Sequence, residues 1–329
     1  MLKVGIIGAG GGIAKNHFNA YDELAKKGMA EVVVCCDAHP ENIEAKENVR
    51  IYSDYNELIE KEKGNLDIID ICLPTFLHKE VSIKALEAGF HVLCEKPMAL
   101  NYEDAAAMVE ASNRTGKKLM IAQVVRFMWD FELMREYIKN EELGKIRNVK
   151  VTEYIKGLPL GQDGWFRKRE LSGGAIFDVH VHAVDSLIWF FGVPESVSTI
   201  ANYNDGVKYD AISTNVVYKD GTFVNIQADW AAASAMHNPG RTLRLNFENG
   251  YIIRDGSQVV KVDRDDNVVP LTVANAQNCY NKEIEYFVNC VINDEPLDVC
   301  PPEESAMAIK FVCNEIKSAD NKGEKVMFD

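Results

Sequence analysis

The fold of this chain is decided near its start, where residues 3–14 read Lys-Val-Gly-Ile-Ile-Gly-Ala-Gly-Gly-Gly-Ile-Ala. A short apolar run ends there in a cluster of glycines, and an amphipathic stretch, residues 14–27, follows at once. Glycines let a backbone approach a phosphate, and the start of a helix offers free N–H groups and a positive dipole end. This order of strand, glycine loop and helix is typical of a dinucleotide-binding domain.

The glycine loop departs from the G-x-G-x-x-G pattern at one position. Gly8 and Gly10 fit the first two glycines, but Ile13 stands where the third is expected. We interpret the loop as this fingerprint with one extra residue in the turn, whereas a merely flexible turn is the alternative. The residues expected to contact the cofactor are Gly8, Gly10, Gly11, Gly12 and Ile13.

The first 123 residues alternate short apolar runs with longer amphipathic ones. Strands buried on both faces and joined by helical crossovers predict a parallel, doubly wound sheet. The expected strands are Lys3–Ile7, Glu31–Cys36, Arg50–Ile51, Asp67–Leu73, His91–Cys94 and Leu119–Gln123. The expected helices are Ala14–Lys27, Phe76–Gly89 with glycine as its stop, and one opened by Asn101 with Asp104 three residues on.

After Gln123 the pattern changes to long strands and turns, which predicts an α+β domain with a large, mostly antiparallel open sheet. The segments expected there are helix Trp129–Lys139, strand Ile146–Lys156, helix Gly173–Phe191, several strands between Glu195 and Val273, and helices Tyr280–Asn293 and Glu303–Ala319. We therefore predict an α/β fold of two consecutive domains: a Rossmann domain over residues 1–123 and a catalytic and oligomerisation domain over residues 124–329.

Composition excludes some classes of function. Lys and Arg number 36 against 50 Asp and Glu, so the net charge of -14 repels polyanions and predicts no nucleic-acid partner. No apolar stretch reaches the roughly 20 residues of a membrane span. The eight cysteines include no C-x-x-C pair, and several lie in apolar strand patterns. We predict reduced thiols and a cytoplasmic protein.

Asp37 ends the second expected strand, 29 residues after Gly8. A carboxylate there can accept hydrogen bonds from both hydroxyls of an adenosine ribose and repels the 2′-phosphate of NADP. Ala38, His39 and Pro40 supply no Arg or Lys for that phosphate, so NAD is preferred to NADP. Asp37 capping the next turn is the alternative.

Three further stretches resemble one known family. They are Cys72-Leu73-Pro74-Thr75-Phe76-Leu77-His78, the run Ala88–Pro97 with Cys94-Glu95-Lys96-Pro97 at its end, and Gly173-Gly174-Ala175-Ile176-Phe177-Asp178 with His182. With the glycine loop, they resemble the glucose–fructose oxidoreductase and inositol dehydrogenase (Gfo/Idh/MocA) family over nearly the whole chain. The resemblance implies reactions mostly on sugars or cyclitols, an active site lined by Lys96, Asp178 and His182, and a cis bond before Pro97. The further cofactor contacts expected are Leu73, Pro74, Thr75, His78, Glu95, Lys96 and Trp165.

The chemistry of Lys96 can be argued separately from the resemblance. It follows the fifth strand, and ligands of open α/β sheets bind beyond the carboxyl ends of the strands. An ammonium group there can hydrogen-bond a reacting hydroxyl and stabilise a developing alkoxide. The alternative is a solvated surface lysine.

Asp178 and His182 are four residues apart on one expected helix and hence on one face of it. Oxidation of an alcohol needs a base for the hydroxyl proton, and the ordinary pKa of histidine suits His182 to that task. Asp178 could hold a substrate hydroxyl. A buried, hydrogen-bonded histidine is the alternative. His180 points away from both, so we expect it to be structural and predict no metal site.

Three other candidates are weaker. Arg126 could bind a substrate hydroxyl or anion, and a structural salt bridge is an equal alternative. Trp165-Phe166-Arg167 lies in a glycine-flanked loop that, by resemblance, approaches the nicotinamide. Tyr280 opens a helix that reaches the substrate in relatives, although core packing explains it equally well.

The first hypothesis is an NAD-dependent oxidoreductase acting on a secondary alcohol of a sugar, sugar derivative or cyclitol. The second is an NAD-using lyase or glycoside hydrolase with transient redox, and the third is a non-catalytic nucleotide-binding sensor. A sheet without helices on one face would expose Val216, Val224 and Ile226 unless another subunit covered them. We therefore predict a homodimer or homotetramer formed through the C-terminal sheet.

Overall fold

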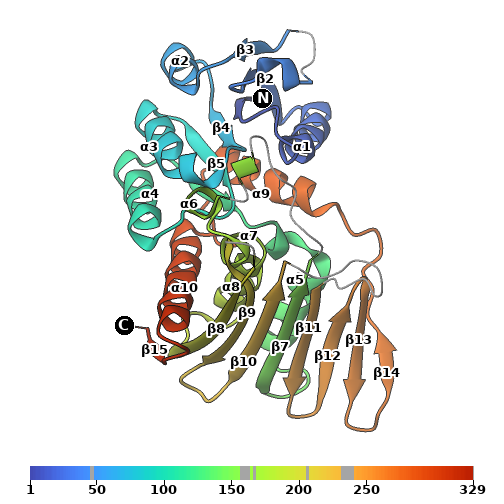
Figure 1. Ribbon diagram of the computed structural model, residues 1–329. Coiled ribbons are helices and arrows are strands. Elements are labelled where there is room, and N and C mark those ends of the chain that lie inside the picture. Colours follow the sequence, from blue (N-terminus) through green and yellow to red (C-terminus); the bar gives the residue numbers. More distant parts are fainter. Residues whose placement is uncertain (45–47, 156–163, 166–167, 205–206, 231–240, 329) are drawn as a thin grey trace. The chain divides into compact units, whose positions relative to one another are not determined.

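The chain forms two compact units, and each unit is built from two separate segments of the sequence. The computed structural model describes residues 1–44, 48–155, 164, 165, 168–204, 207–230 and 241–328 (Figure 1). Unit 1 comprises Met1–Phe127 and Gln277–Ile309, and unit 2 comprises Met128–Ala276 and Lys310–Asp329. The division into 1–123 and 124–329 does not include this return of the chain to unit 1.

Unit 1 is built on a parallel sheet of six strands in the order β3-β2-β1-β4-β5-β6, which confirms the predicted doubly wound sheet. The order places β1 and β4 at its centre, so their C-terminal ends and the loops after them meet at one edge. The strands are β1 (Leu2–Ile7), β2 (Ala30–Cys36), β3 (Arg50–Tyr52), β4 (Ile68–Ile71), β5 (His91–Glu95) and β6 (Leu119–Ala122).

The helices of unit 1 begin and end where their caps predict. The Asn101 side chain accepts the backbone N–H of Asp104, and Gly89 ends its helix in the left-handed conformation with φ +99°. The helices are α1 (Ala14–Lys26), α2 (Tyr55–Lys61), α3 (His78–Ala88), α4 (Tyr102–Thr115) and α9 (Cys279–Asn293), with 3₁₀ turns η1 (Pro40–Asn42), η2 (Thr75–Leu77) and η3 (Val124–Phe127).

Helix α9 explains why the chain returns to unit 1. Its apolar stripe, with Ile284, Phe287 and Val288 all fully buried, packs against α1 and η3. Burying each such side chain is worth about 1.5–3 kcal/mol, which is enough to fix the helix to this unit. Helix α10 (Pro302–Asp320) then passes from unit 1 into unit 2.

Unit 2 contains a sheet of nine strands in the order β14-β13-β12-β11-β7-β10-β9-β8-β15. All neighbours are antiparallel except β7 and β10, which confirms the predicted second sheet. The strands are β7 (Ile146–Tyr154), β8 (Ser196–Asn204), β9 (Val207–Val217), β10 (Phe223–Asp229), β11 (Arg241–Phe247), β12 (Gly250–Asp255), β13 (Gln258–Asp263), β14 (Val268–Pro270) and β15 (Val326–Met327).

The expected single helix over Gly173–Phe191 is wrong. Gly173 and Gly174 have φ of +78° and +84°, and the helical segments around them are α6 (Arg169–Ser172), α7 (Ala175–Asp178) and α8 (His180–Phe191). The segments before and after Val179 are bent by 54°. Asp178 and His182 therefore lie on different helices, and the argument that they share one helical face does not apply. Helix α5 (Trp129–Asn140) agrees with expectation.

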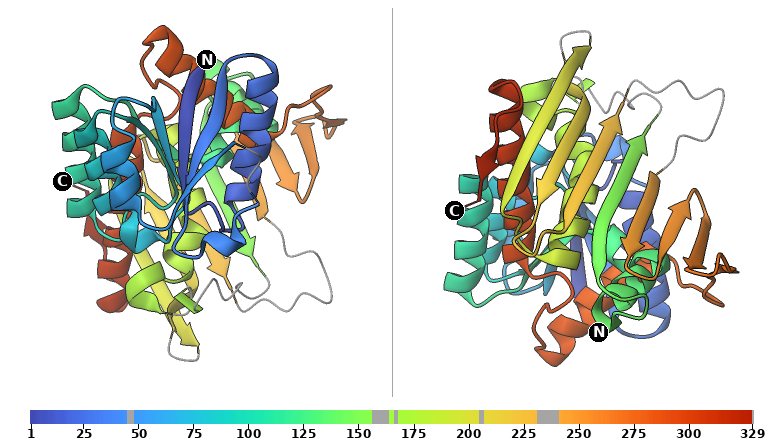
Figure 2. Two further views of the ribbon diagram at one scale, coloured as in Figure 1. Left: turned by 90° about the horizontal axis from the view of Figure 1, so that it is seen from above. Right: turned by 90° about the horizontal axis from the view of Figure 1, so that it is seen from below.

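The two faces of the large sheet differ in polarity. Val216, Val224 and Ile226 are fully buried, and the register of β9 and β10 places them on one face of the sheet. Helices α7 and α8 lie on one side of this sheet (Figure 2), and α7 contacts both β9 and β10. The expectation that these three side chains need a second subunit is wrong, because helices of the same chain cover them. Alternate residues such as Lys150 and Asn215 are exposed on the other face.

Among the described residues no single helix is long and apolar enough to cross a membrane. The bent pair Arg169–Asp178 and His180–Phe191 meets the length and composition criteria together, but most of its second half is buried inside unit 2.

Candidate active site

The glycine loop of unit 1 is held tightly at its start and open at its end. Gly8 has φ +85°, and a Cβ there would lie 2.5 Å from the carbonyl oxygen of Cys72. The N–H of Gly11 donates to the carbonyl of Gly8, whereas a Cβ on Gly12 would meet nothing within 4 Å. A cavity of about 590 Å³ borders the loop and is lined by Gly10–Gly12, Lys15 and Phe18 among others. The bare backbone of this loop is therefore accessible to a ligand.

Asp37 joins the glycine loop to the end of β2. Its Oδ2 accepts the N–H of Gly10 at 2.9 Å, and its Oδ1 accepts the N–H of His39 at 2.9 Å. The second bond is the turn cap considered as the alternative, and the first places the carboxylate against the loop. Each oxygen keeps a second acceptor position, so the cap leaves room for ribose hydroxyls. These residues fit NAD.

His78 connects two loops at the carboxyl edge of the sheet. Its side chain is buried, with Nδ1 2.8 Å from the carbonyl oxygen of Pro97 and Nε2 2.8 Å from that of Leu73. Burial lowers its pKa in spite of these two carbonyls. The ring thus joins the loops after β4 and β5, and the cofactor contact expected of His78 stays a prediction. Leu73 and Pro74 are half-buried in the first of these loops, and Thr75 is buried.

Lys96 stands directly after β5, at the carboxyl edge of the sheet, and is half-buried. Its bond to Pro97 is cis, as the resemblance implies. The backbone N–H of Lys96 donates to Oε2 of Glu95 at 3.0 Å. The conformation of the loop is thus tied to the Glu95 carboxylate, which is 7% exposed.

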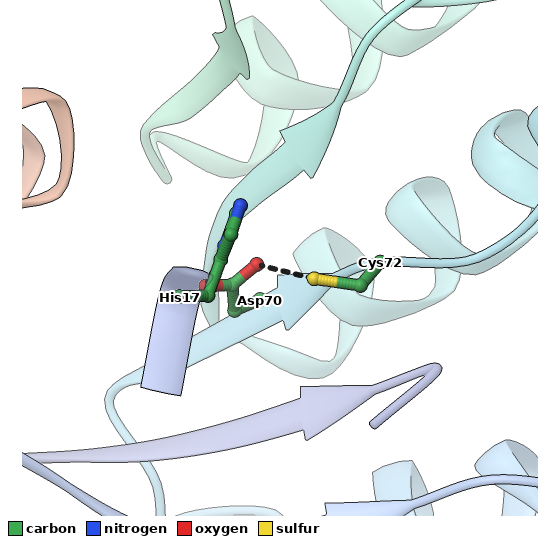
Figure 3. A group of neighbouring side chains, drawn as sticks. All are labelled: His17, Asp70 and Cys72. Carbon is green, nitrogen blue, oxygen red and sulfur yellow. Dashed lines mark hydrogen bonds and ion pairs between the residues drawn. The ribbon is translucent and has the colours of Figure 1, made fainter. Parts of the chain in front are cut away.

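A buried polar cluster below Lys96, formed by His17, Asp70 and Glu95, was not predicted from the sequence. His17 Nδ1 lies 2.8 Å from Asp70 Oδ2, and His17 Nε2 lies 3.1 Å from Glu95 Oε1. Figure 3 shows His17 and Asp70 together with Cys72, whose thiol donates to Asp70. We call His17, Asp70 and Glu95 together, without Cys72, the strand-end cluster.

Tyr280 and Arg126, the two predicted substrate residues, have different surroundings. The Tyr280 ring is half-buried with its centroid 6.5 Å from that of His17, and burial with the nearby Glu95 raises its pKa to about 12. Arg126 is fully buried, and its Nη1 donates to Glu304 Oε2 at 2.5 Å and to the Val299 carbonyl at 3.0 Å. The structure therefore favours the salt-bridge alternative for Arg126.

In unit 2, Asp178 and His182 stand out by their exposure. From Ser172 to Trp189, a stretch described throughout, every residue is buried except these two. The N–H of His182 donates to the carbonyl of Val179 at the bend. Trp165 is half-buried, and its neighbours Phe166 and Arg167 lie outside the described residues.

His180 is structural, as expected. It is fully buried, and Nε2 lies 2.8 Å from Oε1 of Glu315 on α10. Burial lowers the pKa of His180, but Glu315 outweighs it, so the pKa lies above its ordinary value.

Comparison with known proteins identifies the family. Residues 2–123 match the model described as an oxidoreductase family with an NAD-binding Rossmann fold, and residues 131–253 match the GFO/IDH/MocA C-terminal domain. The chain belongs to the Gfo/Idh/MocA oxidoreductase family. The predicted family is thereby confirmed.

Curated relatives in this family include sugar-modifying enzymes. D-glucoside 3-dehydrogenase of Escherichia coli K12 is 32% identical over 61% of this chain and 57% of its own length. Glucose-6-phosphate 3-dehydrogenase of Bacillus subtilis 168 is 30% identical over 64% of this chain and 60% of its own. The chain thus spans about three fifths of these two relatives. A 2,7-anhydro-N-acetylneuraminate hydratase of Escherichia coli K12 is 27% identical over 83% of this chain and 70% of its own length.

Solved structures of the family share the fold of the whole chain. An oxidoreductase of Thermotoga maritima has a TM-score of 0.85 at 23% identity and covers 99% of this chain and 98% of its own. A levoglucosan dehydrogenase in complex with NADH and levoglucosan also has a TM-score of 0.85, at 21% identity, over 100% and 99% of the two chains. At these identities the comparison shows that the fold is shared, and nothing further.

Proposed function

We propose that this chain is an NAD-dependent oxidoreductase that oxidises a secondary alcohol on a sugar, sugar derivative or cyclitol. The observation that supports it best is that the glycine loop, Asp37 and Lys96 all follow strands at the carboxyl edge of one parallel sheet. Membership of an oxidoreductase family and the sugar dehydrogenases among its relatives support the same class of substrate.

The glycine loop and Asp37 would hold NAD, which accepts the hydride when bound. Lys96 would hydrogen-bond the substrate hydroxyl and stabilise negative charge that develops on its oxygen. His182 would take the hydroxyl proton, and Asp178 would hold a neighbouring hydroxyl. The absence of Lys and Arg from residues 38–42 supports NAD over NADP.

The test is a panel of sugars and cyclitols with NAD and with NADP, followed by the absorbance of the reduced nicotinamide. Lys96→Met and His182→Asn should each lose most turnover, by roughly 100-fold or more, and still bind NAD by calorimetry. His91→Gln, at the opposite end of β5 from Lys96, is the matched control and should retain turnover. Full turnover in both active-site variants would overturn the mechanism.

A second candidate is a lyase or hydratase in which NAD is reduced and then reoxidised within one turnover. The hydratase among the relatives favours it, since its match extends over 83% of this chain. Loss of substrate without net NADH would support this candidate, whereas stoichiometric NADH would exclude it. A protein that binds no nicotinamide nucleotide by calorimetry would instead point to the non-catalytic sensor.

We also propose that copies of this chain associate through the exposed face of the large sheet. Ile200 and Phe223 are 68% and 54% exposed there, beside polar residues such as Lys150 and Asn215. An apolar side chain with polar neighbours suits an interface between copies. Light scattering should give a dimer or tetramer, and a monomer at micromolar concentration would contradict the proposal.

We propose a cytoplasmic location from the state of the cysteines. The eight cysteines all lie within the described residues, none forms a disulfide there, and six of them are buried. Thiols of this kind persist where the compartment is reducing. Localisation of a tagged chain outside the cytoplasm would contradict this placement.

A further inference from the structure

The strand-end cluster joins three elements of unit 1. His17 projects from α1, Asp70 lies in β4, and Glu95 ends the neighbouring strand β5. His17 and Asp70 are fully buried. The proposed function uses neither of them, and the role proposed for them rests on that function.

The geometry fits a charged histidine. A carboxylate oxygen can only accept, and each ring nitrogen of His17 faces one, so both nitrogens must donate. Such a ring is an imidazolium. Burial lowers the pKa of His17, but the charge of the Asp70 carboxylate outweighs it, so the pKa lies well above its ordinary value. A buried cation between two carboxylates avoids the large cost of an unpaired buried charge.

The other histidine near Glu95 is His78, and burial lowers its pKa, so it stays neutral. The cysteine, tyrosine and glutamate side chains near the cluster carry no positive charge in any protonation state. Cys72 follows β4, Tyr21 is on α1, and Tyr280 and Glu283 are on α9. Burial raises the pKa of the Cys72 thiol to about 12 and that of Tyr21 well above its ordinary value, so both stay neutral. The positive charge of the cluster therefore resides on His17.

A metal site is the other reading of this cluster. One candidate ligand atom from each of His17, Asp70 and Cys72 lies within 4.8 Å of the others. A metal would need a lone pair on the imidazole and a thiolate. Both ring nitrogens instead donate to carboxylates, and the thiol is neutral. The hydrogen-bond pattern thus favours an ion-pair cluster.

We propose that His17 is a positioning residue for Lys96. The imidazolium holds one oxygen of Glu95, while the other oxygen of the same carboxylate accepts the backbone N–H of Lys96. Fixing Glu95 from both sides fixes the loop that presents the Lys96 ammonium. Asp70 completes the arrangement, because its bond to Nδ1 sets the plane of the ring and so aims Nε2 at Glu95.

A purely structural role must be separated from this one. Removing His17 alone leaves two carboxylates buried together and destabilises the protein in either case. Two double variants remove that complication, since both also neutralise Asp70: His17→Gln/Asp70→Asn keeps an N–H near Glu95, and His17→Met/Asp70→Asn does not. His91→Gln again serves as the control for loss of a histidine from unit 1.

The experiment compares three measurements in the full-length variants: kcat, the melting temperature, and amide hydrogen exchange of Lys96 by NMR. We expect His17→Met/Asp70→Asn to melt below His17→Gln/Asp70→Asn, because it leaves Glu95 without that donor, so kcat and exchange are compared well below both melting temperatures. His17→Met/Asp70→Asn should lose about 10-fold to 100-fold in kcat, because a misplaced catalytic group costs that much, with NAD affinity little changed. Its Lys96 amide should exchange faster, and His17→Gln/Asp70→Asn should lie nearer the wild type in both.

Equal kcat and equal Lys96 exchange in the two double variants would overturn the proposal. Lys96 exchange does not depend on turnover, so it tests the inference even if no sugar or cyclitol is oxidised, which would instead be a failure of the proposed function. Stoichiometric zinc in the purified protein, lost on His17→Gln, would also overturn it in favour of a metal site.

Discussion

Gly8→Ala should destabilise unit 1 far more than Gly12→Ala, although both lie in one loop. An alanine at position 8 must adopt φ +85°, which costs a non-glycine residue about 1–3 kcal/mol. Its Cβ would also lie 2.5 Å from the carbonyl oxygen and 2.6 Å from the carbonyl carbon of Cys72. These are backbone atoms at the end of a central strand, and relieving such overpacking costs about 1–3 kcal/mol. The sum is about 2–6 kcal/mol.

Gly12→Ala is the matched control for stability. A Cβ there meets no atom within 4 Å, and the residue has no positive φ. The substitution should leave stability unchanged or raise it by about 0.4–1 kcal/mol, because alanine restricts the unfolded chain.

A chain of two units need not unfold in one step, so the measurement must report on unit 1 alone. Hydrogen-exchange mass spectrometry of peptides from β1 and β4 gives the local free energy of opening. The reasoning is refuted if Gly8→Ala keeps these free energies within about 0.5 kcal/mol of the wild type, or if Gly12→Ala loses as much.

Three further predictions concern charged groups. The pKa values of His17 and His180 are raised above 6.5, so their ion pairs stabilise fully below that pH, and the stabilisation is lost as the pH rises through the raised values. The melting temperature should therefore fall from pH 6 to pH 9.5, and it should fall by less in His180→Gln. An equal fall in the two proteins would contradict a stabilising ion pair at His180. Arg126→Met should cost about 1–3 kcal/mol by leaving the Val299 carbonyl without a donor, with NAD affinity unchanged by calorimetry. Asp37→Ala should weaken the binding of NAD and reduce the preference for NAD over NADP about tenfold. An unchanged ratio of the two dissociation constants would mean that Asp37 only caps the turn.

The first sheet could be predicted closely because its strands are buried on both faces. Continuous apolar runs mark such strands, and the observed β2, Ala30–Cys36, differs by one residue from the expected Glu31–Cys36. The same holds at Asn101 and Gly89, where capping depends only on residues within one turn. Local chemistry therefore fixed the ends of these elements.

The return of α9 to unit 1 could not be predicted in this way. The helical spacing of Ile284, Phe287 and Val288 shows that something covers this stripe, and any apolar surface would satisfy it. The surface that does so belongs to α1, more than 250 residues earlier. The bend at Val179 could not be predicted for a different reason. Its segment is buried on nearly all sides, so the sequence there has no pattern of polar and apolar residues that would change at a bend.

The large sheet shows the same limit in the assignment of its faces. Alternation correctly put Val216, Val224 and Ile226 on apolar faces, but period two does not say which face the helices cover. The expectation that these three side chains need a second subunit to cover them failed on that choice, whereas the association of copies stays a prediction. In contrast, Asp178 and His182 were predicted from their motif, and their half-exposure within a buried stretch is a separate physical signal.

The strand-end cluster could have been found in part from the sequence. Asp70 lies within Ile68-Ile69-Asp70-Ile71, a run otherwise typical of a strand buried on both faces. A carboxylate in such a strand needs a buried cationic or hydrogen-bonding partner, because its desolvation is costly. His17 lies four residues before Tyr21 on the inner stripe of the first helix, where an apolar residue is expected. Each polar residue thus predicts a partner, and the strand–helix order brings the two elements together. Glu95 could not be assigned as the second partner, because that requires the order of strands in the sheet.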